Sequence, residues 1–187
     1  MTCIVGYVDN KNRKLYLAGD SIAADVKHYH CSIRKDPKVF KRDKFLMGFT
    51  DSFRMGQLLM SDERFKVRKQ KEKESNFNFM VNAFIPAVQE LFDIGGYLKI
   101  KNEVFHGGNF LVGYNGELFE IQSNFQVATY NVHYAAVGAG EFYAMASLYT
   151  SDKFDLTAEE KITLALETAV NFSGYVRPPF VILSMKF

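Results

Sequence analysis

The sequence has no tryptophan, only four prolines and only two cysteines among its 187 residues. Two cysteines, Cys3 and Cys31, are too few for the disulfide framework of a small secreted domain, so the expected setting is reducing and cytoplasmic. No segment approaches the roughly 18 consecutive apolar residues of a membrane span, and the N-terminus lacks the basic and apolar regions of a signal peptide. The net charge of +2 is too small to predict a nucleic-acid partner.

The chain is instead rich in aromatic residues, with 18 phenylalanines and 10 tyrosines. Together with 48% hydrophobic and 24% charged residues, this composition is that of an ordinary globular chain, expected to form one domain over residues 1–187. The aromatic residues predict a phenylalanine-rich interior or interface. No glycine-rich phosphate loop followed by Lys-Ser or Lys-Thr is present, so the sequence predicts no nucleotide cofactor and no other cofactor.

The first twenty residues hold the most informative pattern. Removal of Met1 would leave Thr2 with a free α-amine beside its own hydroxyl. A threonine hydroxyl is a weak acid that needs a neighbouring base, and an α-amine, whose unperturbed pKa is about 7.7–8.0, suits that task near neutral pH. Thr2 is therefore a candidate nucleophile that carries its own base.

Short alternating segments surround this residue. Residues 4–8 and 15–18 flank a polar turn at residues 9–13 and predict a hairpin, which returns Asp20 towards Thr2. Residues 37–40 and 44–49 predict a second strand pair, which brings Lys38 to the same end. These three side chains are expected to lie together.

The order of these motifs resembles the proteasome β-subunit and HslV-like family of N-terminal-nucleophile hydrolases. The shared features are a Thr-x-Ile-Val-Gly start, Ala-Gly-Asp-Ser, Lys-Val opening a strand, Met-Gly-Phe before a helix, and Val-Gly-Ala-Gly at residues 137–140. The resemblance implies a threonine peptidase in a homo-oligomeric ring. It also implies peptide or unfolded-protein substrates and a separate ATPase.

Matched by position, Thr2 is the nucleophile, Asp20 the acid and Lys38 the lysine of that family. A Lys38 ammonium near the Thr2 hydroxyl would favour the alkoxide and lower the proton affinity of the α-amine, while Asp20 would keep the lysine charged and oriented. The turn at Thr50 and Asp51 would supply backbone N–H donors to the oxyanion.

Four supporting positions differ from the family pattern, either in residue type or by an offset. Glycine is usual at the oxyanion turn, and an Asp51 carboxylate there would repel the oxyanion unless it points away. Ala139, before Gly140, replaces a serine. Asn171 replaces an aspartate, and Ser173 is offset by about one residue. An inactive scaffold or binding protein, or a small-molecule amidase, therefore remain as alternative functions.

Residues 21–36 are polar, and we expect them to be irregular. The resemblance implies that this segment lines the substrate pocket, with Cys31 and Ser32 as candidate pocket residues. His28 and His30 could share one face of a strand, as in a partial metal site, but a structural site needs four ligands. A pocket wall or plain surface is favoured, and no metal site is predicted.

A basic run at residues 64–73 has two interpretations, a nucleic-acid patch or a solvated helix end or linker, of which the second is favoured. Helices are predicted from Asp51 or Ser52, from about Asn76 with a kink or late start at Pro86, and over residues 141–149 and 157–172. Further strands are predicted over residues 109–113, 117–121, 126–130, 133–137 and 181–185. This order predicts an α+β protein, and the resemblance implies a four-layer αββα sandwich.

Overall fold

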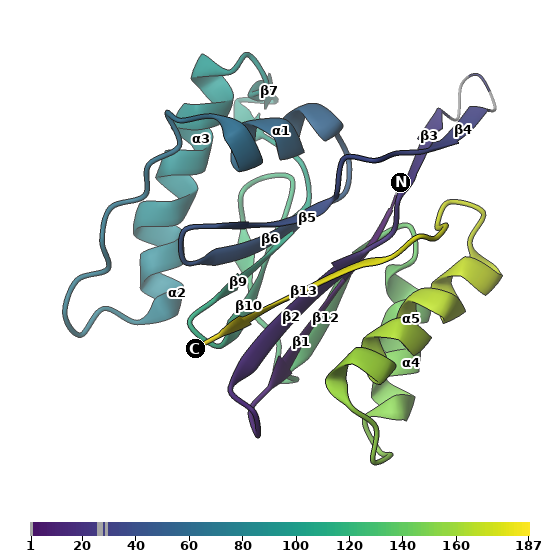
Figure 1. Ribbon diagram of the computed structural model, residues 1–187. Helices are drawn as coiled ribbons and strands as arrows, with labels where there is room; N and C mark the ends of the chain where they lie inside the picture. Colours follow the sequence, from purple (N-terminus) through teal and green to yellow (C-terminus); the bar gives the residue numbers. More distant parts are fainter. Residues whose placement is uncertain (1, 26–27, 29) are drawn as a thin grey trace.

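The computed structural model describes residues 2–25, 28 and 30–187 and has four layers (Figure 1). Helices α1, α2 and α3 cover the outer face of one sheet, and α4 and α5 cover the outer face of a second sheet (Figure 1). The two sheets stack face to face. The predicted α+β class and αββα sandwich are confirmed.

The first sheet carries the N-terminal hairpin. Its strand order is β12-β1-β2-β13, and all of its neighbours are antiparallel. The predicted hairpin is confirmed, because Ile4 pairs with Gly19 and Asp9 with Lys14. The strands are β1 (Cys3–Asp9), β2 (Lys14–Gly19), β12 (Tyr134–Gly138) and β13 (Val181–Lys186).

The second sheet has the order β11-β10-β9-β6-β5. Its turn at Asn115 and Gly116 has positive φ at both residues (+46° and +79°), as an Asn-Gly hairpin requires. The strand expected over residues 126–130 is shorter in the structure. The strands are β5 (Val39–Arg42), β6 (Phe45–Phe49), β9 (Phe110–Tyr114), β10 (Glu117–Ile121) and β11 (Val127–Ala128).

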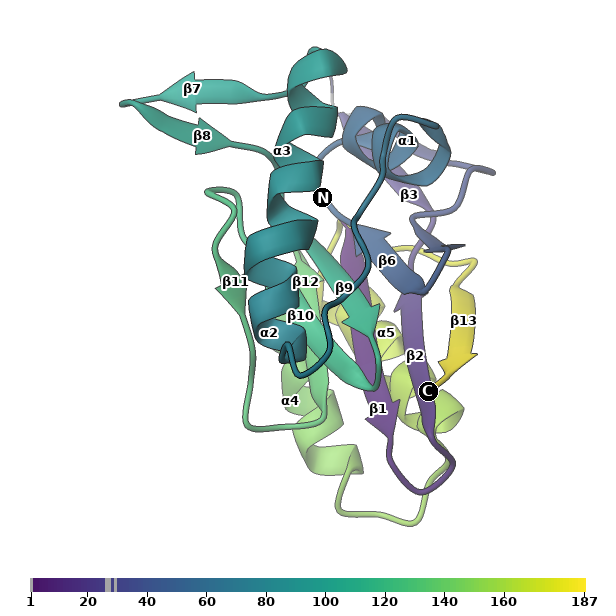
Figure 2. The same ribbon diagram turned by 90° about the vertical axis from the view of Figure 1, so that its left-hand side faces the viewer.

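Two hairpins differ from the sequence prediction. Residues 21–36, expected to be irregular, contain paired strands β3 (Ile22–Asp25) and β4 (His30–Ile33). A second hairpin, β7 (Lys99–Lys101) and β8 (Val104–His106), was not predicted and projects from the end of α3 (Figure 2). β4 and β7 are fully exposed, so these hairpins lack the alternation of apolar residues that marks a half-buried strand.

The helices lie close to their predicted positions. Ser52 caps α1 (Phe53–Ser61), and a Thr157–Glu160 capping box opens α5 (Ala158–Phe172) after α4 (Glu141–Ser151). Before Pro86 the chain forms a π-helical turn rather than a sharp kink, which joins the second and third helices. These segments are α2 (Asn76–Phe79), η1 (Met80–Phe84) and α3 (Ile85–Ile94). The basic run lies in the non-helical linker between α1 and α2, as favoured.

The largest apolar cluster lies between the second sheet and helices α1 to α3 and includes many phenylalanines, which confirms the aromatic interior. A smaller cluster lies between the sheets, and a third between the first sheet and helices α4 and α5. Over the residues that are described, no helix combines the length and apolarity needed to cross a membrane.

Close packing of the two sheets yields a first prediction. A Cβ atom at Gly113 would lie 2.2 Å from Leu15 Cδ2, so Gly113→Ala forces the sheets or Leu15 to shift. We expect a loss of about 1–3 kcal/mol in the free energy of unfolding, measured by urea denaturation. Gly174→Ala is the matched control, because no atom lies within 4 Å of its added Cβ. Equal stability of the two variants would contradict the packing described.

Candidate active site

The ends of three strands bring Thr2, Asp20 and Lys38 together. Thr2 directly precedes β1, Asp20 directly follows β2, and Lys38 directly precedes β5. Lys38 Nζ donates hydrogen bonds to Thr2 Oγ1 at 2.6 Å and to Asp20 Oδ1 at 2.9 Å. All three residues are at most 1% exposed. The predicted proximity is thus observed, whereas the predicted removal of Met1 concerns a residue outside those described.

The Asp20 carboxylate has several donors besides Lys38. Its Oδ1 accepts the Cys3 N–H at 3.0 Å, and its Oδ2 accepts the N–H groups of Ile22 at 3.1 Å and Arg177 at 3.4 Å. A buried carboxylate is tolerated when its lone pairs are filled in this way. Asp20 is therefore a fixed negative charge that orients the lysine.

Burial lowers the pKa of Lys38 below the ordinary value of a lysine, and the nearby Asp20 charge and hydrogen bond act in the opposite direction. The Phe53 ring centroid lies 6.0 Å from Lys38 Nζ. The ammonium thus faces a hydroxyl, a carboxylate and an aromatic ring. A cation in this position stabilises negative charge that develops on Thr2 Oγ1.

The turn at residues 138–140 packs directly on Thr2. Gly138 has φ +101°, and a Cβ there would lie 2.4 Å from Thr2 O. Gly140 is buried and its N–H lies 3.4 Å from Thr2 O, whereas Ala139 is exposed. The Gly138 N–H donates to Glu141 Oε2 at 3.0 Å. Burial raises the pKa of Glu141, which the Gly138 N–H opposes and the Glu120 charge increases.

Thr50 and Asp51 form the turn that follows β6. The Thr50 N–H donates to Asn109 O at 3.2 Å, so this N–H is already used within the protein. Asp51 Oδ2 accepts the Asn109 N–H at 2.7 Å. The carboxylate of Asp51 is therefore engaged by a backbone donor. No sequence pattern predicted this role of Asn109, because its partner Asp51 is 58 positions away.

The two supporting residues near the end of α5 differ in burial. Asn171 is exposed, and its side chain makes no hydrogen bond to any residue in the described ranges. Ser173 is buried; its Oγ accepts the Tyr175 N–H at 3.3 Å, and its carbonyl accepts a bond from the Arg177 guanidinium. Ser173 thus orders the loop that carries Arg177, whose N–H reaches Asp20.

A pocket opens beside the turn at Thr50 and Asp51. Ser32 lines it, whereas Cys31, the next residue on β4, is exposed and is not among its lining residues. The remaining walls come from β3, β4 and the start of α1: Ala23, Ala24, Asp25, His30 and Phe53.

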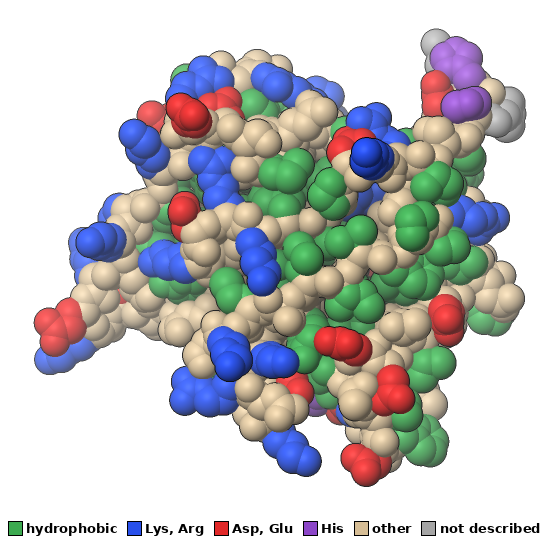
Figure 3. Space-filling view, viewed as in Figure 1, with side chains coloured by type: hydrophobic (Ala, Val, Ile, Leu, Met, Phe, Trp, Pro, Cys, Tyr) green, Lys and Arg blue, Asp and Glu red, His purple; other side chains and the backbone are tan. Residues whose placement is uncertain are grey.

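The two candidate metal-ligating histidines lie at the exposed outer end of the β3–β4 hairpin, where Figure 3 shows histidine side chains. His28 Nδ1 pairs with Asp25 Oδ2 at 2.7 Å. Within the described part of the chain, no three His, Cys, Asp or Glu side chains are grouped so as to hold a metal ion.

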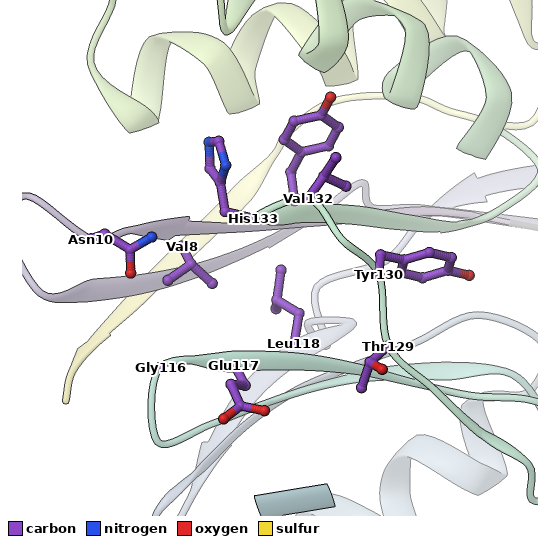
Figure 4. A pocket seen from close by; sticks show the side chains of 10 residues that line it. Val8, Asn10, Gly116, Glu117, Leu118, Thr129, Tyr130, Val132 and His133 are labelled. Atoms are coloured by element: carbon purple, nitrogen blue, oxygen red, sulfur yellow. The ribbon is translucent and has the colours of Figure 1, made fainter.

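A polar cluster absent from the sequence prediction lies near the opposite end of β1. Asp152 Oδ1 accepts bonds from Tyr7 Oη at 2.8 Å and Lys161 Nζ at 3.0 Å, and His133 Nε2 lies 3.1 Å from the same oxygen. His133 also borders a pocket between the edges of the two sheets (Figure 4). The residue of β1 that lines this pocket is Val8, near the end of the strand opposite to Thr2, so the pocket is remote from Thr2.

Comparisons with solved structures give the fold. The chain is similar to Thiobacillus denitrificans BPH (TM-score 0.75, 15% identity, 100% of this chain and 98% of that chain). It is also similar to a eukaryotic HslV from Trypanosoma brucei (TM-score 0.70, 17% identity, 100% of both chains). A third similar structure is an Anbu (Gly-1) mutant from Hyphomicrobium sp. strain MC1 (TM-score 0.67, 18% identity, 100% and 82%). No protein-family model and no curated protein matches the sequence.

The resemblance to proteasome-like N-terminal-nucleophile hydrolases is therefore confirmed in the fold. At 15–18% identity, the similarity shows the fold alone, and the chemistry depends on the residues of the site.

The turn at residues 138–140 yields a second prediction. Gly138→Ala places a side chain at a positive φ and against Thr2 O, so we expect a loss of about 1–3 kcal/mol in the free energy of unfolding. The neighbouring Ala139→Ser should change it by less than about 0.5 kcal/mol, because Ala139 is exposed. Guanidinium denaturation measures both. A Gly138→Ala protein as stable as the wild type would refute the described contact.

Proposed function

We propose that the protein is a threonine peptidase whose nucleophile is Thr2, exposed by removal of Met1. The observation that carries this proposal is the position of Lys38 Nζ, within hydrogen-bond distance of both Thr2 Oγ1 and Asp20 Oδ1. A buried lysine held between a hydroxyl and a carboxylate favours ionisation of the hydroxyl.

In the proposed reaction, the α-amine of Thr2 takes the proton of its own hydroxyl, and Oγ1 attacks the carbonyl carbon of a peptide bond. The Lys38 ammonium lowers the proton affinity of the hydroxyl oxygen during this step. The backbone N–H of Asp51 stabilises the oxyanion, because the Thr50 N–H of the same turn is already used by Asn109.

The protonated amine then gives its proton to the leaving amine, so the C–N bond breaks and an ester forms between Thr2 and the acyl half of the substrate. Water, deprotonated by the α-amine, hydrolyses this ester and regenerates Thr2. No cofactor is needed. Ala139, Gly140, Asn171 and Ser173 do not take part in these steps; Gly140 and Ser173 support the backbone around Thr2 and Asp20.

The proposal is supported by the proteins that share this fold. One similar structure is BPH in complex with epoxomicin, and another is an HslV. By this analogy we propose a homo-oligomeric ring that encloses the sites and acts on peptides or unfolded proteins in the cytoplasm. The sequence has no phosphate-binding loop, so any unfolding ATPase would be a separate protein.

A second candidate function, a catalytically inactive scaffold of the same fold, is favoured by two observations. Ala139 supplies no hydroxyl near Thr2, and Asn171 is exposed in the last turn of α5. A small-molecule amidase would share the nucleophile but lack the ring. A monomeric or dimeric mass in solution would favour the amidase over the ring peptidase.

The third prediction tests the nucleophile and its lysine. Thr2→Ala and Lys38→Ala should each lower turnover of fluorogenic peptides by about 10³-fold or more, because each removes a group that acts in the transition state. Lys38→Ala should remain folded, since Asp20 keeps its three backbone N–H donors. Circular dichroism checks the fold of each variant. Near-wild-type turnover in either variant would refute the assignment.

The fourth prediction concerns pH. The α-amine must be neutral to accept a proton and Lys38 must be charged, so kcat/KM should follow a bell-shaped pH profile. Because the pKa of Lys38 is lowered, its ammonium is lost on the alkaline side at a lower pH than for a free lysine. We therefore expect the alkaline midpoint below about pH 10.4, measured with a fluorogenic peptide. A rate that stays constant through that pH in folded protein would contradict the role given to Lys38.

A further inference from the structure

The hydrogen-bond pattern between β6 and β9 changes at the pair of residues that follows the two strands' last ladder pair. The two strands pair antiparallel up to Phe49 and Phe110, so Thr50 and Asn109 form the next pair. The Thr50 N–H donates to Asn109 O at 3.2 Å. In a regular antiparallel ladder, a pair of this type exchanges both of its N–H···O bonds. Here the return bond goes elsewhere: the Asn109 N–H donates to Asp51 Oδ2 at 2.7 Å.

The Asp51 carboxylate thus takes the place of the Thr50 carbonyl in the ladder. Its second oxygen, Oδ1, lies 3.2 Å from Thr50 Oγ1, whose hydroxyl also lies 2.8 Å from Asn109 O. One side chain therefore binds both the facing strand and its own preceding residue. We call this set of contacts among Thr50, Asp51 and Asn109 the Asp51 latch.

The latch leaves the peptide group between Thr50 and Asp51 outside the ladder. In the ranges that the structure describes, no group donates to Thr50 O, and the Asp51 N–H has no acceptor. Asp51 is exposed, so this N–H stays free to pair with a group that enters from solvent. Thr50 and Asp51 line the same pocket as Phe53, whose ring centroid is 6.0 Å from Lys38 Nζ.

We propose that the Asp51 side chain is a positioning residue that holds the Asp51 N–H free as the oxyanion donor. This inference rests on the proposed peptidase function and adds the device that orients its donor. Oxyanion stabilisation depends on donors that are fixed before the reaction, and the latch fixes this peptide through the Asn109 N–H. The same two hydrogen bonds hold the carboxylate charge against Asn109 and Thr50, which limits its repulsion of the oxyanion.

Two substitutions separate the latch from the charge. Asp51→Asn keeps a side-chain oxygen that can accept the Asn109 N–H, so kcat should stay within about threefold of the wild type. Asp51→Ala removes the acceptor, so kcat should fall on the order of 10²-fold, as when an oxyanion donor is lost, while KM changes less than about twofold. Glu63→Gln, which neutralises an exposed carboxylate two residues after α1, is the control and should match the wild type.

Wild-type kcat in Asp51→Ala would overturn the proposal. Equal losses in Asp51→Asn and Asp51→Ala would overturn it too, because the charge rather than the acceptor would then matter. A rise in KM with unchanged kcat would assign Asp51 to substrate binding and reject the positioning role.

Amide hydrogen exchange of Asn109, followed by NMR, tests the latch without turnover. We expect slow exchange in the wild type and in Asp51→Asn, and exchange at least about tenfold faster in Asp51→Ala. Equal exchange in all three proteins would overturn the latch. A wild type that neither cleaves peptides nor reacts with epoxomicin would overturn the proposed function and the positioning role of Asp51. The Asn109 exchange would still decide whether the latch exists.

Discussion

The arrangement around Lys38 is the constraint on which the rest of the site depends. Lys38 and Asp20 are both almost completely buried, and Lys38 Nζ has only Asp20 and Thr2 as hydrogen-bond partners among the described residues, whereas Asp20 has three backbone N–H donors as well. Thr2 and Asp20 directly flank strands of the first sheet, whereas Lys38 precedes a strand of the second. The pairing therefore forms only when the two sheets stack, and the stacked sheets fix the distance between Lys38 Nζ and Thr2 Oγ1.

Small residues allow the backbone to approach Thr2 as closely as this chemistry needs. Gly138 and Gly140 pack against Thr2 and Cys3, where added side chains would collide with them. Burial, with the charges of Asp20 and Glu141, raises the pKa of the Cys3 thiol, so the cysteine beside the proposed nucleophile is held in its unreactive form. The environment of Cys3 thus opposes ionisation of its thiol, whereas Lys38 Nζ donates a hydrogen bond to the Thr2 hydroxyl next to it.

Much of this arrangement could be predicted from the sequence, because its components follow local rules. Short turns and alternating strands brought Asp20 back to Thr2, the capping box opened α5, and Asn115-Gly116 closed a hairpin. The contacts that could not be predicted join distant residues. The Asn109 N–H meets Asp51 58 positions away, and Tyr7 meets Asp152 145 positions away. The hairpins β3–β4 and β7–β8 were missed because β4 and β7 consist of exposed residues, and such strands leave no periodic signal.

The proposed chemistry requires that Thr2 becomes an N-terminal residue with a free amine and a reactive hydroxyl. The most direct test is the intact mass of the purified native protein before and after incubation with epoxomicin, with peptide mapping of the adduct. Because the epoxyketone reacts with both the hydroxyl and the α-amine of such a residue, we predict loss of the Met1 mass and one covalent adduct at Thr2. Retention of Met1 with no adduct would refute a free N-terminal threonine and leave a protein with the fold but without the chemistry.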